Sequence, residues 1–318
     1  VGTGYNFKSG RSSQPLRSAT VALDYSNSIF AADKEFSLQC KIKLPKSANT
    51  GYGYISNGFL GFRDPANNNG AGVVFSISGN RPALALRNGA GTGDVSTLVG
   101  PTDVADNFWH TLTFVKRKTG ATYTGVYYMD GNVIGTINNI TASFNTAFPF
   151  CVGMMKHAVL NPIANATYGT QDNDGWATTN LNVTDIRIYN TALADTYVQN
   201  NYCGVEVGTD DAYFNNLLGF WKGTQIVEEA ANKFVLDDYA PANNNPLLIL
   251  DPSVKTNKLN INETTIKVCP PLSVSTYKSL MNSVDVSYQI YSWLGVAPST
   301  SWSLDGKIVL PNYIDVSN

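Results

Sequence analysis

The sequence predicts a mainly β protein: an antiparallel two-sheet sandwich followed by a small α+β domain. Residues 36–44 alternate apolar and polar side chains, which is the period of a strand with one buried face. Asp130-Gly131 separates two apolar runs, and this pair suits the type I′ turn of a hairpin, which needs positive φ at both central positions. Many short strand patterns with frequent turn signals precede the first helical pattern, which favours a sandwich.

Strand patterns follow one another through the first part of the chain. We expect strands, some of them paired in hairpins, over residues 5–7, 18–23, 36–44, 51–62, 73–78, 83–87, 108–115, 126–135, 148–154 and 183–189. In the strand at 36–44, the polar side chains are expected to face water. After the last of these strands, Thr191 can cap a short helix that runs from 192 to about 200.

The composition is that of a folded chain with few charges. Hydrophobic residues make up 43% of the 318 positions, which excludes global disorder. Charged residues make up 14%, below the roughly 25% typical of soluble domains. The formal net charge of −2 gives no electrostatic case for nucleic acid, and no apolar run approaches the roughly 20 residues of a membrane span. Because amides and hydroxyls keep many secreted β proteins soluble, we expect an extracytoplasmic location: secreted, periplasmic or at the cell surface.

Four segments resemble, in family order, the motifs of laminin-G-like domains in the concanavalin A-like lectin-glucanase superfamily. They are similar to the family's dFTIEaWVK strand, its WHhvA strand, its LYVDGk hairpin and its DeVRIWnrAL segment, and they lie at residues 33–42, 107–112, 127–131 and 185–193. The resemblance implies a two-sheet jelly roll over residues 1–204. It also implies binding of glycans or proteins, in some members with calcium at the rim of the sandwich.

Residues 205–318 predict the separate small α+β domain. Short strands are expected at 217–222, 234–239 and 247–250, and Pro270-Pro271 marks a break. A helix is expected from Ser283, because apolar residues at 286, 290, 293 and 294 share one helical face and Gly295 suits the position after the helix.

The end of the chain carries two further resemblances. Residues 285–296 and 304–307 are similar to the closing segment of alkaline-phosphatase-like hydrolases. The region is also similar to a C-terminal domain of unknown function that follows laminin-G-like modules in some bacterial secreted proteins. No metal-binding histidine or nucleophile segment of such hydrolases accompanies the first resemblance, so it implies no phosphatase activity.

The four cysteines, Cys40, Cys151, Cys203 and Cys269, show no C-x-x-C spacing, which argues against a zinc ribbon or a thioredoxin-like site. Cys40 alternates with apolar residues in a strand and is expected in the core. Buried free thiols are therefore the first expectation. A disulfide such as Cys203–Cys269 is the alternative, and the sequence does not decide between them.

Catalytic chemistry finds little support in the sequence. Its histidines, His110 and His157, show no partner for a Ser-His-Asp triad, and His110 is expected to be structural. Jelly-roll glycosidases need two carboxylates that flank the scissile bond. None of the glutamates fits the Glu-x-Asp-x-(x)-Glu pattern that such enzymes usually carry, so we expect no enzyme.

A calcium site is one candidate in the long polar segment 156–181. Asp172-Asn173-Asp174-Gly175 places carboxylates close together on a loop that turns at a glycine, and Ca²⁺ prefers such oxygen ligands. Asp172 and Asp174 are the candidate metal ligands, although the closing bidentate glutamate of a calcium loop is absent. An ordinary polar loop explains the same residues.

A sugar site is the second candidate, on loops. Trp176 and Tyr168 can stack on sugar rings beside the amide of Asn173, and Asp64 and Asn67 can bind hydroxyl groups. Packing aromatics and plain turn chemistry are the alternatives.

These observations predict a non-catalytic, extracytoplasmic binding module. Its expected ligand is a glycan or polysaccharide, bound at rim loops with calcium as a candidate cofactor. The alternative is a structural or protein-interaction module of a larger multidomain hydrolase, whose partner is another protein or an upstream catalytic domain. A glycoside hydrolase is the third hypothesis.

Overall fold

The structure is a computed structural model of the 318-residue chain. It describes residues 5–7, 18–20, 29–44, 58–63, 72–87, 96–144, 150–152, 181–222, 227–230, 233–241, 247–249 and 283–296. The chain forms two compact units, Val1–Lys267 and Val268–Asn318. Among the described residues, no helix is long and apolar enough to cross a membrane.

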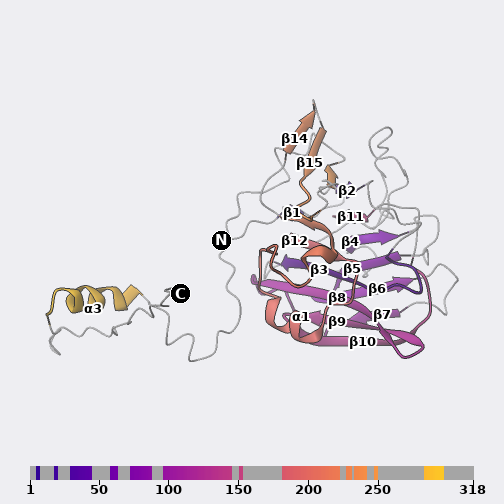
Figure 1. The fold of residues 1–318 in the computed structure, drawn as a ribbon, viewed down its shortest axis with the longest axis horizontal. Coiled ribbons are helices and arrows are strands. Elements are labelled where there is room, and N and C mark those ends of the chain that lie inside the picture. The colour runs from indigo at the N-terminus through magenta and orange to yellow at the C-terminus, as the bar shows by residue number, and fades with distance from the viewer. Residues whose placement is uncertain are drawn as a thin grey trace. The chain divides into compact units, whose positions relative to one another are not determined.

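The first unit is a sandwich of two antiparallel sheets, which confirms the predicted fold class (Figure 1). The β3 sheet, with seven strands in the described residues, has the order β1 (Tyr5–Phe7), β12 (Leu181–Tyr189), β3 (Phe36–Lys43), β8 (Trp109–Thr119), β9 (Thr122–Met129) and β10 (Asn132–Ile140), while β13 (Leu217–Trp221) also pairs with β12. The β5 sheet, with nine described strands, has the order β14 (Val227–Ala230), β15 (Lys233–Leu236), β16 (Leu247–Ile249), β2 (Ser18–Thr20), β11 (Phe150–Val152), β4 (Gly58–Arg63), β5 (Gly72–Ser78), β6 (Arg81–Arg87) and β7 (Ser96–Val99).

The main core lies between the two sheets and follows from the alternation in the sequence. Phe36, Leu38, Cys40 and Ile42 of β3 are buried on the inner face together with the apolar residues of β5 and β6. Aromatic rings cross the sandwich, as where the rings of Phe75 and Tyr127 lie 5.7 Å apart. Burial of these side chains supplies most of the driving force that holds the two sheets together.

The hairpin at Asp130-Gly131 is confirmed. β9 and β10 pair around it, and both turn residues have positive φ, 50° for Asp130 and 77° for Gly131. A side chain at Gly131 would also meet the helix that packs on the turn, because a Cβ atom there would lie 3.0 Å from the Cα atom of Gln199. The turn is therefore a packing surface as well as a connection.

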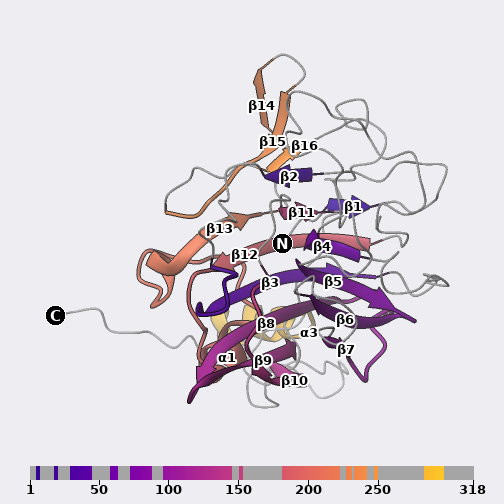
Figure 2. The same cartoon turned by 90° about the vertical axis from the view of Figure 1, so that its right-hand side faces the viewer.

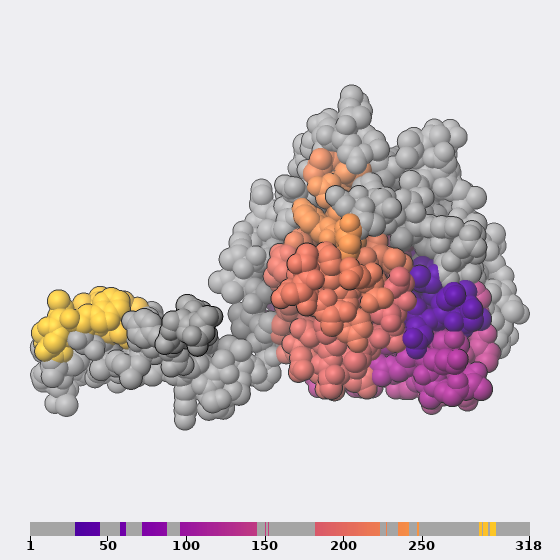
Figure 3. All heavy atoms as spheres, viewed as in Figure 1, coloured from indigo at the N-terminus to yellow at the C-terminus, as the bar shows by residue number. Residues whose placement is uncertain are grey.

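The outer face of β3 is buried, so the expectation that its polar side chains face water is wrong. Ser37, Gln39, Lys41 and Lys43 are at most 8% exposed. The cover comes from the chain after β12, which returns across the sheet through α1 (Asp195–Asn201), η2 (Phe214–Asn216) and β13. In Figure 2, α1 lies beside β8 and β9, and Figure 3 shows the salmon residues from β12 to β13 as a continuous surface on the viewed face.

Two buried cations of this outer face, Lys41 and Arg187, bind the backbone of the covering segment. Lys41 Nζ donates to the carbonyl oxygens of Cys203 and Gly204, both at 2.7 Å, and lies 3.4 Å from Asp185 Oδ2. The Arg187 guanidinium donates to the Gly204 oxygen at 2.8 Å. Buried charges persist only with such partners, so the two cations fasten the cover to the sheet.

Helix α1 begins later than predicted. Its N-cap is Ala194, which provides no side-chain cap, whereas the sequence predicts a cap at Thr191. The cause is a contact with β3. Ser37 Oγ donates to the backbone carbonyl oxygen of Thr191 at 2.8 Å and accepts the backbone N–H of Leu193 at 3.0 Å. These bonds hold residues 191–193 outside the helix.

Cys40 and Cys203 differ in oxidation state. Cys40 is free and buried in the core, as expected. Cys203 is disulfide-bonded, so the expectation of free thiols is wrong there. Cys203 follows α1 in the covering segment rather than alternating with core residues in a strand, which is why the core argument does not apply to it.

Strand pairing joins the region beyond residue 204 to the sandwich. Ile186 of β12 pairs with Trp221 of β13, and Leu248 of β16 pairs with Ala19 of β2. Several strands of the region predicted as a second domain, 205–318, therefore complete the two sheets of the first unit.

The second unit contains α3 (Ser283–Trp293), at the predicted position. Gly295, just after it, has a φ of 67°, in the left-handed region that a helix end often requires. The apolar side chains of Val286, Ile290, Trp293 and Leu294 are exposed, up to 76% for Trp293.

Candidate functional site

All of the site residues predicted from the sequence lie outside the described residues: Asp64, Asn67, Tyr168, Asp172, Asn173, Asp174 and Trp176. Both the sugar site and the calcium site therefore stay predictions. Within the described part of the chain, no group of three or more His, Cys, Asp or Glu side chains is placed to hold a metal ion.

A polar groove opens at the rim of the β3 sheet, with a volume of about 570 Å³. That volume is within the roughly 300–1,000 Å³ of small-molecule sites, but the groove is wide open to solvent rather than enclosed. The lining consists of Ile29, Asp33, Lys34, Glu35, Lys118, Tyr123 and Asn190. Four neighbouring strands contribute: the segment before β3, the end of β8, the start of β9 and the residue after β12.

Strand register brings these distant residues together. Lys118 pairs with Tyr123 across β8 and β9, and Phe36, next to Glu35, pairs with Lys116 across β3 and β8. The Glu35 carboxylate then accepts the backbone N–H of Lys118 at 2.7 Å. The groove is therefore positioned by the sheet itself, which is a rigid support for a binding site.

Lys116 lies behind the groove wall and is fully buried. Its ammonium donates to the carbonyl oxygens of Ala31, Ala32 and Lys34 at 2.8, 2.9 and 2.8 Å. Burial lowers the pKa of Lys116 to about 8, against the charges of Asp33 and Glu35, which raise it. The side chain therefore carries its charge at neutral pH.

The remaining groove residues present donors, acceptors and a ring at the surface. The Tyr123 hydroxyl donates to the backbone carbonyl oxygen of Asp33 at 2.7 Å, and one face of its ring lies 4.4 Å from the Lys116 ammonium, measured to the ring centroid. Asn190 is exposed, and its Oδ1 accepts from Asn216 at 2.9 Å. The Nδ2 group of the Asn190 amide is the hydrogen-bond donor of this lining residue.

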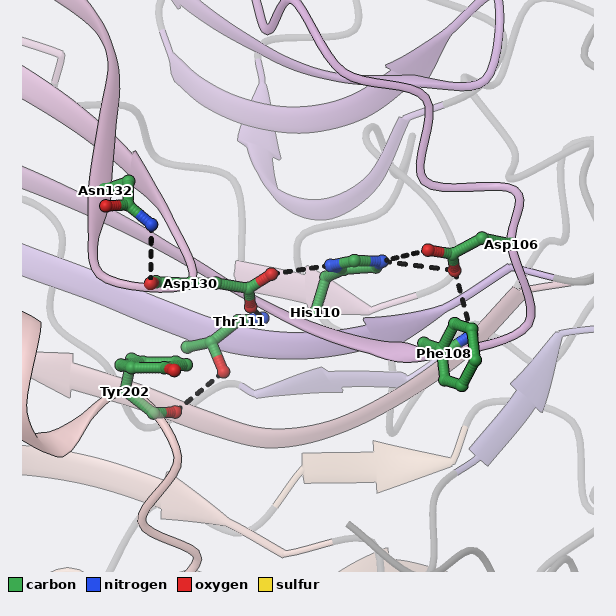
Figure 4. Close-up of polar contacts among 7 residues, drawn as sticks. All are labelled: Asp106, Phe108, His110, Thr111, Asp130, Asn132 and Tyr202. Carbon is green, nitrogen blue, oxygen red and sulfur yellow. Dashed lines mark hydrogen bonds and ion pairs between the residues drawn. The ribbon is translucent and has the colours of Figure 1, made fainter. Parts of the chain in front are cut away.

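A second polar cluster surrounds His110 at the start of β8 (Figure 4). Nδ1 of His110 lies 2.6 Å from Asp130 Oδ2, and Nε2 lies 3.0 Å from Asp106 Oδ2. Burial lowers the pKa of His110, but the hydrogen bonds and charges of Asp130 and Asp106 outweigh it, so the pKa lies above its usual 6.5. Both ring nitrogens are engaged within the fold, as expected for a structural histidine rather than a catalytic base.

The groove was not predictable from a local motif, because its residues come from four segments. One signal was present in the sequence. Lys116 follows Leu112 and Phe114 at a spacing of two, so it occupies a core-facing position of its strand. A lysine at a core-facing position needs buried hydrogen-bond acceptors, so it indicates that another segment of the chain covers it and provides them.

Comparison with known proteins gives one sequence family and several similar solved structures. Residues 207–310 match a family described as a domain of unknown function (DUF4983), in agreement with the resemblance of the C-terminal region. No curated protein matches the sequence. Among solved structures, a protein from Bacteroides ovatus whose assignment to carbohydrate binding is provisional is 9% identical, with a TM-score of 0.50, over 78% of this chain and 58% of that chain.

Two further structures are similar at lower scores. A heptameric SAP-like pentraxin from Limulus polyphemus is 13% identical, with a TM-score of 0.41, over 78% of this chain and 95% of that one. The CBM40 domain of a Ruminococcus gnavus sialidase, solved with a sialyllactose, is 13% identical, with a TM-score of 0.37, over 63% and 93%. The Bacteroides likeness shows the fold, a β-sandwich, and this chain spans 58% of that protein's length.

Proposed function

We propose that the protein is a non-catalytic carbohydrate-binding module that holds a glycan in the rim groove. The observation that carries the proposal is the lining of that groove: two carboxylates, two ammonium groups, an amide and a phenol ring around about 570 Å³. The fold shared with the Bacteroides ovatus protein supports the same class of function.

The groove chemistry suits a hydroxyl-rich, uncharged ligand. Carboxylates of Asp33 and Glu35 accept hydrogen bonds from hydroxyl groups, while the ammonium groups of Lys34 and Lys118 donate to sugar oxygens. The two signs of charge balance, so the lining does not select for a strongly acidic or basic ligand. The exposed part of the Tyr123 ring offers an apolar surface for a sugar ring.

The same residues argue against hydrolysis. A glycosidase needs a carboxyl group sheltered from water as its general acid and a second carboxylate across the bond. The Asp33 side chain is 76% exposed, and Glu35 Oε1 accepts the Lys118 backbone N–H at an exposed position. Neither supplies the sheltered acid.

Location and calcium extend the proposal. An extracytoplasmic location is supported by the disulfide at Cys203, since disulfides persist in oxidising compartments. Calcium bound by Asp172 and Asp174, and stacking by Trp176, would add a second set of contacts outside the described residues. Binding measured with and without a chelator, and in Trp176→Ala, tests these contacts separately from the groove.

A protein-interaction role is the second candidate. The exposed stripe of Val286, Ile290, Trp293 and Leu294 on α3 favours it, because contiguous exposed apolar residues often mark a contact surface. An upstream catalytic domain in a longer chain is one such partner.

A glycan array followed by calorimetry tests the carbohydrate proposal. We expect binding to neutral glycans and an affinity about tenfold lower in Asn190→Ala, since one lost hydrogen bond contributes roughly that factor. Asn138→Ala is the matched control, because Asn138 is also an exposed amide but lines a different hollow, on β10. An array without a bound glycan, or equal losses in both variants, would contradict the groove as the site.

A further inference from the structure

The surroundings of Lys116 resemble a cation site whose occupant is the protein's own side chain. An ammonium has three N–H donors, and three carbonyl oxygens accept them, from Ala31, Ala32 and Lys34. All three acceptors come from one short loop that wraps around the nitrogen. The donors are therefore fully used within a single turn of backbone.

Aromatic rings close the rest of the shell. The ammonium lies 4.4 Å from the ring centroid of Tyr123, 5.9 Å from that of Phe36 and 6.0 Å from that of Phe144. Ring faces attract cations, and the attraction grows when water is excluded, as it is around the fully buried Lys116. Carbonyls and rings thus converge on one positive charge.

Without a cation this arrangement would be unfavourable. Three carbonyl dipoles that point their negative ends at one place repel one another, and oxygen shells of this kind otherwise surround bound metal ions. The loop that supplies the carbonyls also carries Asp33 and Lys34, which line the groove. Tyr123 links the loop to the buried lysine, since its hydroxyl donates to the backbone carbonyl oxygen of Asp33 and its ring faces the ammonium.

We propose that the carbonyls of Ala31, Ala32 and Lys34, with the ring of Tyr123, form a monovalent-cation cage that Lys116 fills. Its ammonium orders the loop as a bound metal ion would, and Lys116 is thereby a positioning residue for the groove. The consequence for ligand binding rests on the proposed function, whereas the cage itself does not. The loop at 31–34 then needs no divalent cation to keep its shape.

Hydrogen exchange of the 31–35 amides at pH 6.5, where Lys116 is charged, tests the cage without any glycan. In Lys116→Ala, we expect these amides to exchange at least about tenfold faster, because three charge-assisted hydrogen bonds are lost. n-Propylammonium carries the atoms that the substitution removes, and at about 0.1 M it should restore most of the protection by binding the emptied cage. Tetramethylammonium at equal concentration carries the same charge without N–H donors, and its methyl groups keep that charge away from the carbonyl oxygens, so it should not restore the protection.

Lys116→Met is the companion variant. Methionine replaces the apolar part of the lysine side chain without its charge. In this variant the 31–35 amides should exchange faster than in wild type, while the amides of β3 and β8 stay protected. Propylammonium should not reverse the change, because methionine fills the space that the compound would occupy. This variant keeps the test valid if Lys116→Ala does not fold. Wild-type protection should be unchanged by a chelator of divalent cations.

Two results would overturn the cage: a loop of Lys116→Met that exchanges at the wild-type rate, or a Lys116→Ala loop that exchanges as fast with propylammonium as with tetramethylammonium. Affinity for the glycan found on the array is a separate readout, expected to fall in Lys116→Ala and to recover with propylammonium. An array without binding combined with a rescued loop would reject the proposed function and leave the cage standing.

Discussion

His110 and Asp130 are joined by a hydrogen bond of 2.6 Å between Nδ1 and Oδ2, across 20 residues of sequence. The other oxygen of Asp130 accepts the backbone N–H of Thr111 at 2.8 Å. The Thr111 hydroxyl in turn donates to the backbone carbonyl oxygen of Tyr202, just after α1, at 2.7 Å. One carboxylate in the hairpin turn therefore ties together the start of β8, the β9–β10 turn and the end of the covering helix.

The histidine contact predicts a pH-dependent stability. Because the folded-state pKa of His110 is raised above 6.5, its contribution is fully present below pH 6.5 and is lost as pH rises through the folded-state pKa. We expect His110→Gln to reduce the free energy of unfolding by about 1.5–3 kcal/mol near pH 5.5, the range for a hydrogen bond to a charged group, and by less at pH 9.

Urea unfolding of wild type and His110→Gln across that pH range measures this difference. Groups that both proteins share, such as Lys116, cancel when the two curves are subtracted. A difference that is constant with pH would show that the imidazole is not charged between its two carboxylates.

Lys41 should be far more important for stability than its surface counterpart. Lys41→Met leaves the carbonyls of Cys203 and Gly204 and the carboxylate of Asp185 without its ammonium in a buried place. We expect a loss of about 3 kcal/mol in the free energy of unfolding, as for a broken buried ion pair. Lys118→Met, at an exposed lysine, should change it by no more than about 0.5 kcal/mol. Chemical denaturation would contradict this account if the two variants lost the same amount.

Cys40 should be inert in the folded protein. Burial raises the pKa of its thiol well above the usual range, and the thiolate is the reactive form. We expect no alkylation of Cys40 by iodoacetamide at pH 8 under native conditions and complete alkylation in denaturant, as measured by peptide mass spectrometry. Native labelling at a rate near that of a small-molecule thiol would mean that this part of the core opens.

Truncated chains should show whether the sandwich ends at Gly204 or extends to Lys267. A chain that ends at Gly204 lacks β13, and so leaves residues 186–189 of β12 without that partner and uncovers Tyr189. We expect aggregation or a non-cooperative melt, because unpaired edges and apolar surface promote association. A chain that ends at Lys267 should be monomeric with a cooperative melt. Size-exclusion chromatography and thermal melts decide this, and a well-behaved 1–204 chain would refute the expectation.

Local patterns in the sequence predicted the parts of the fold that local physics determines. The alternation around Phe36 identifies the inner face of β3, and Asp130-Gly131 identifies a turn that needs two positive φ values. The spacing from Val286 to Leu294 identifies α3. Each of these depends only on neighbours within a few residues.

Contacts between distant segments account for what the patterns missed. Lys41 is polar and alternates with apolar residues, so its pattern predicts exposure to water. It is buried because the backbone carbonyl of Cys203, 162 positions later, accepts a hydrogen bond from its ammonium. The start of α1 moved because Ser37, 154 positions away, binds Thr191. The groove depends on the same long-range register, so its residues could be recognised only once the strands were paired.

The divided pairing of β12 bears on how such proteins can be recombined. Residues 181–183 of this strand pair with β1, whereas 186–189 pair with β13, which lies inside the segment 207–310 that matches a sequence family of its own. The first strand of the matched segment thus completes a sheet that is formed by residues before the segment. If a gene fusion placed this segment after an unrelated domain, β13 would lose its pairing with β12. It would stay paired only if that domain had an unpaired strand edge in the same register. The segment matched by the sequence family therefore begins at a residue that is not a boundary of the fold, because the ladder between β12 and β13 crosses it.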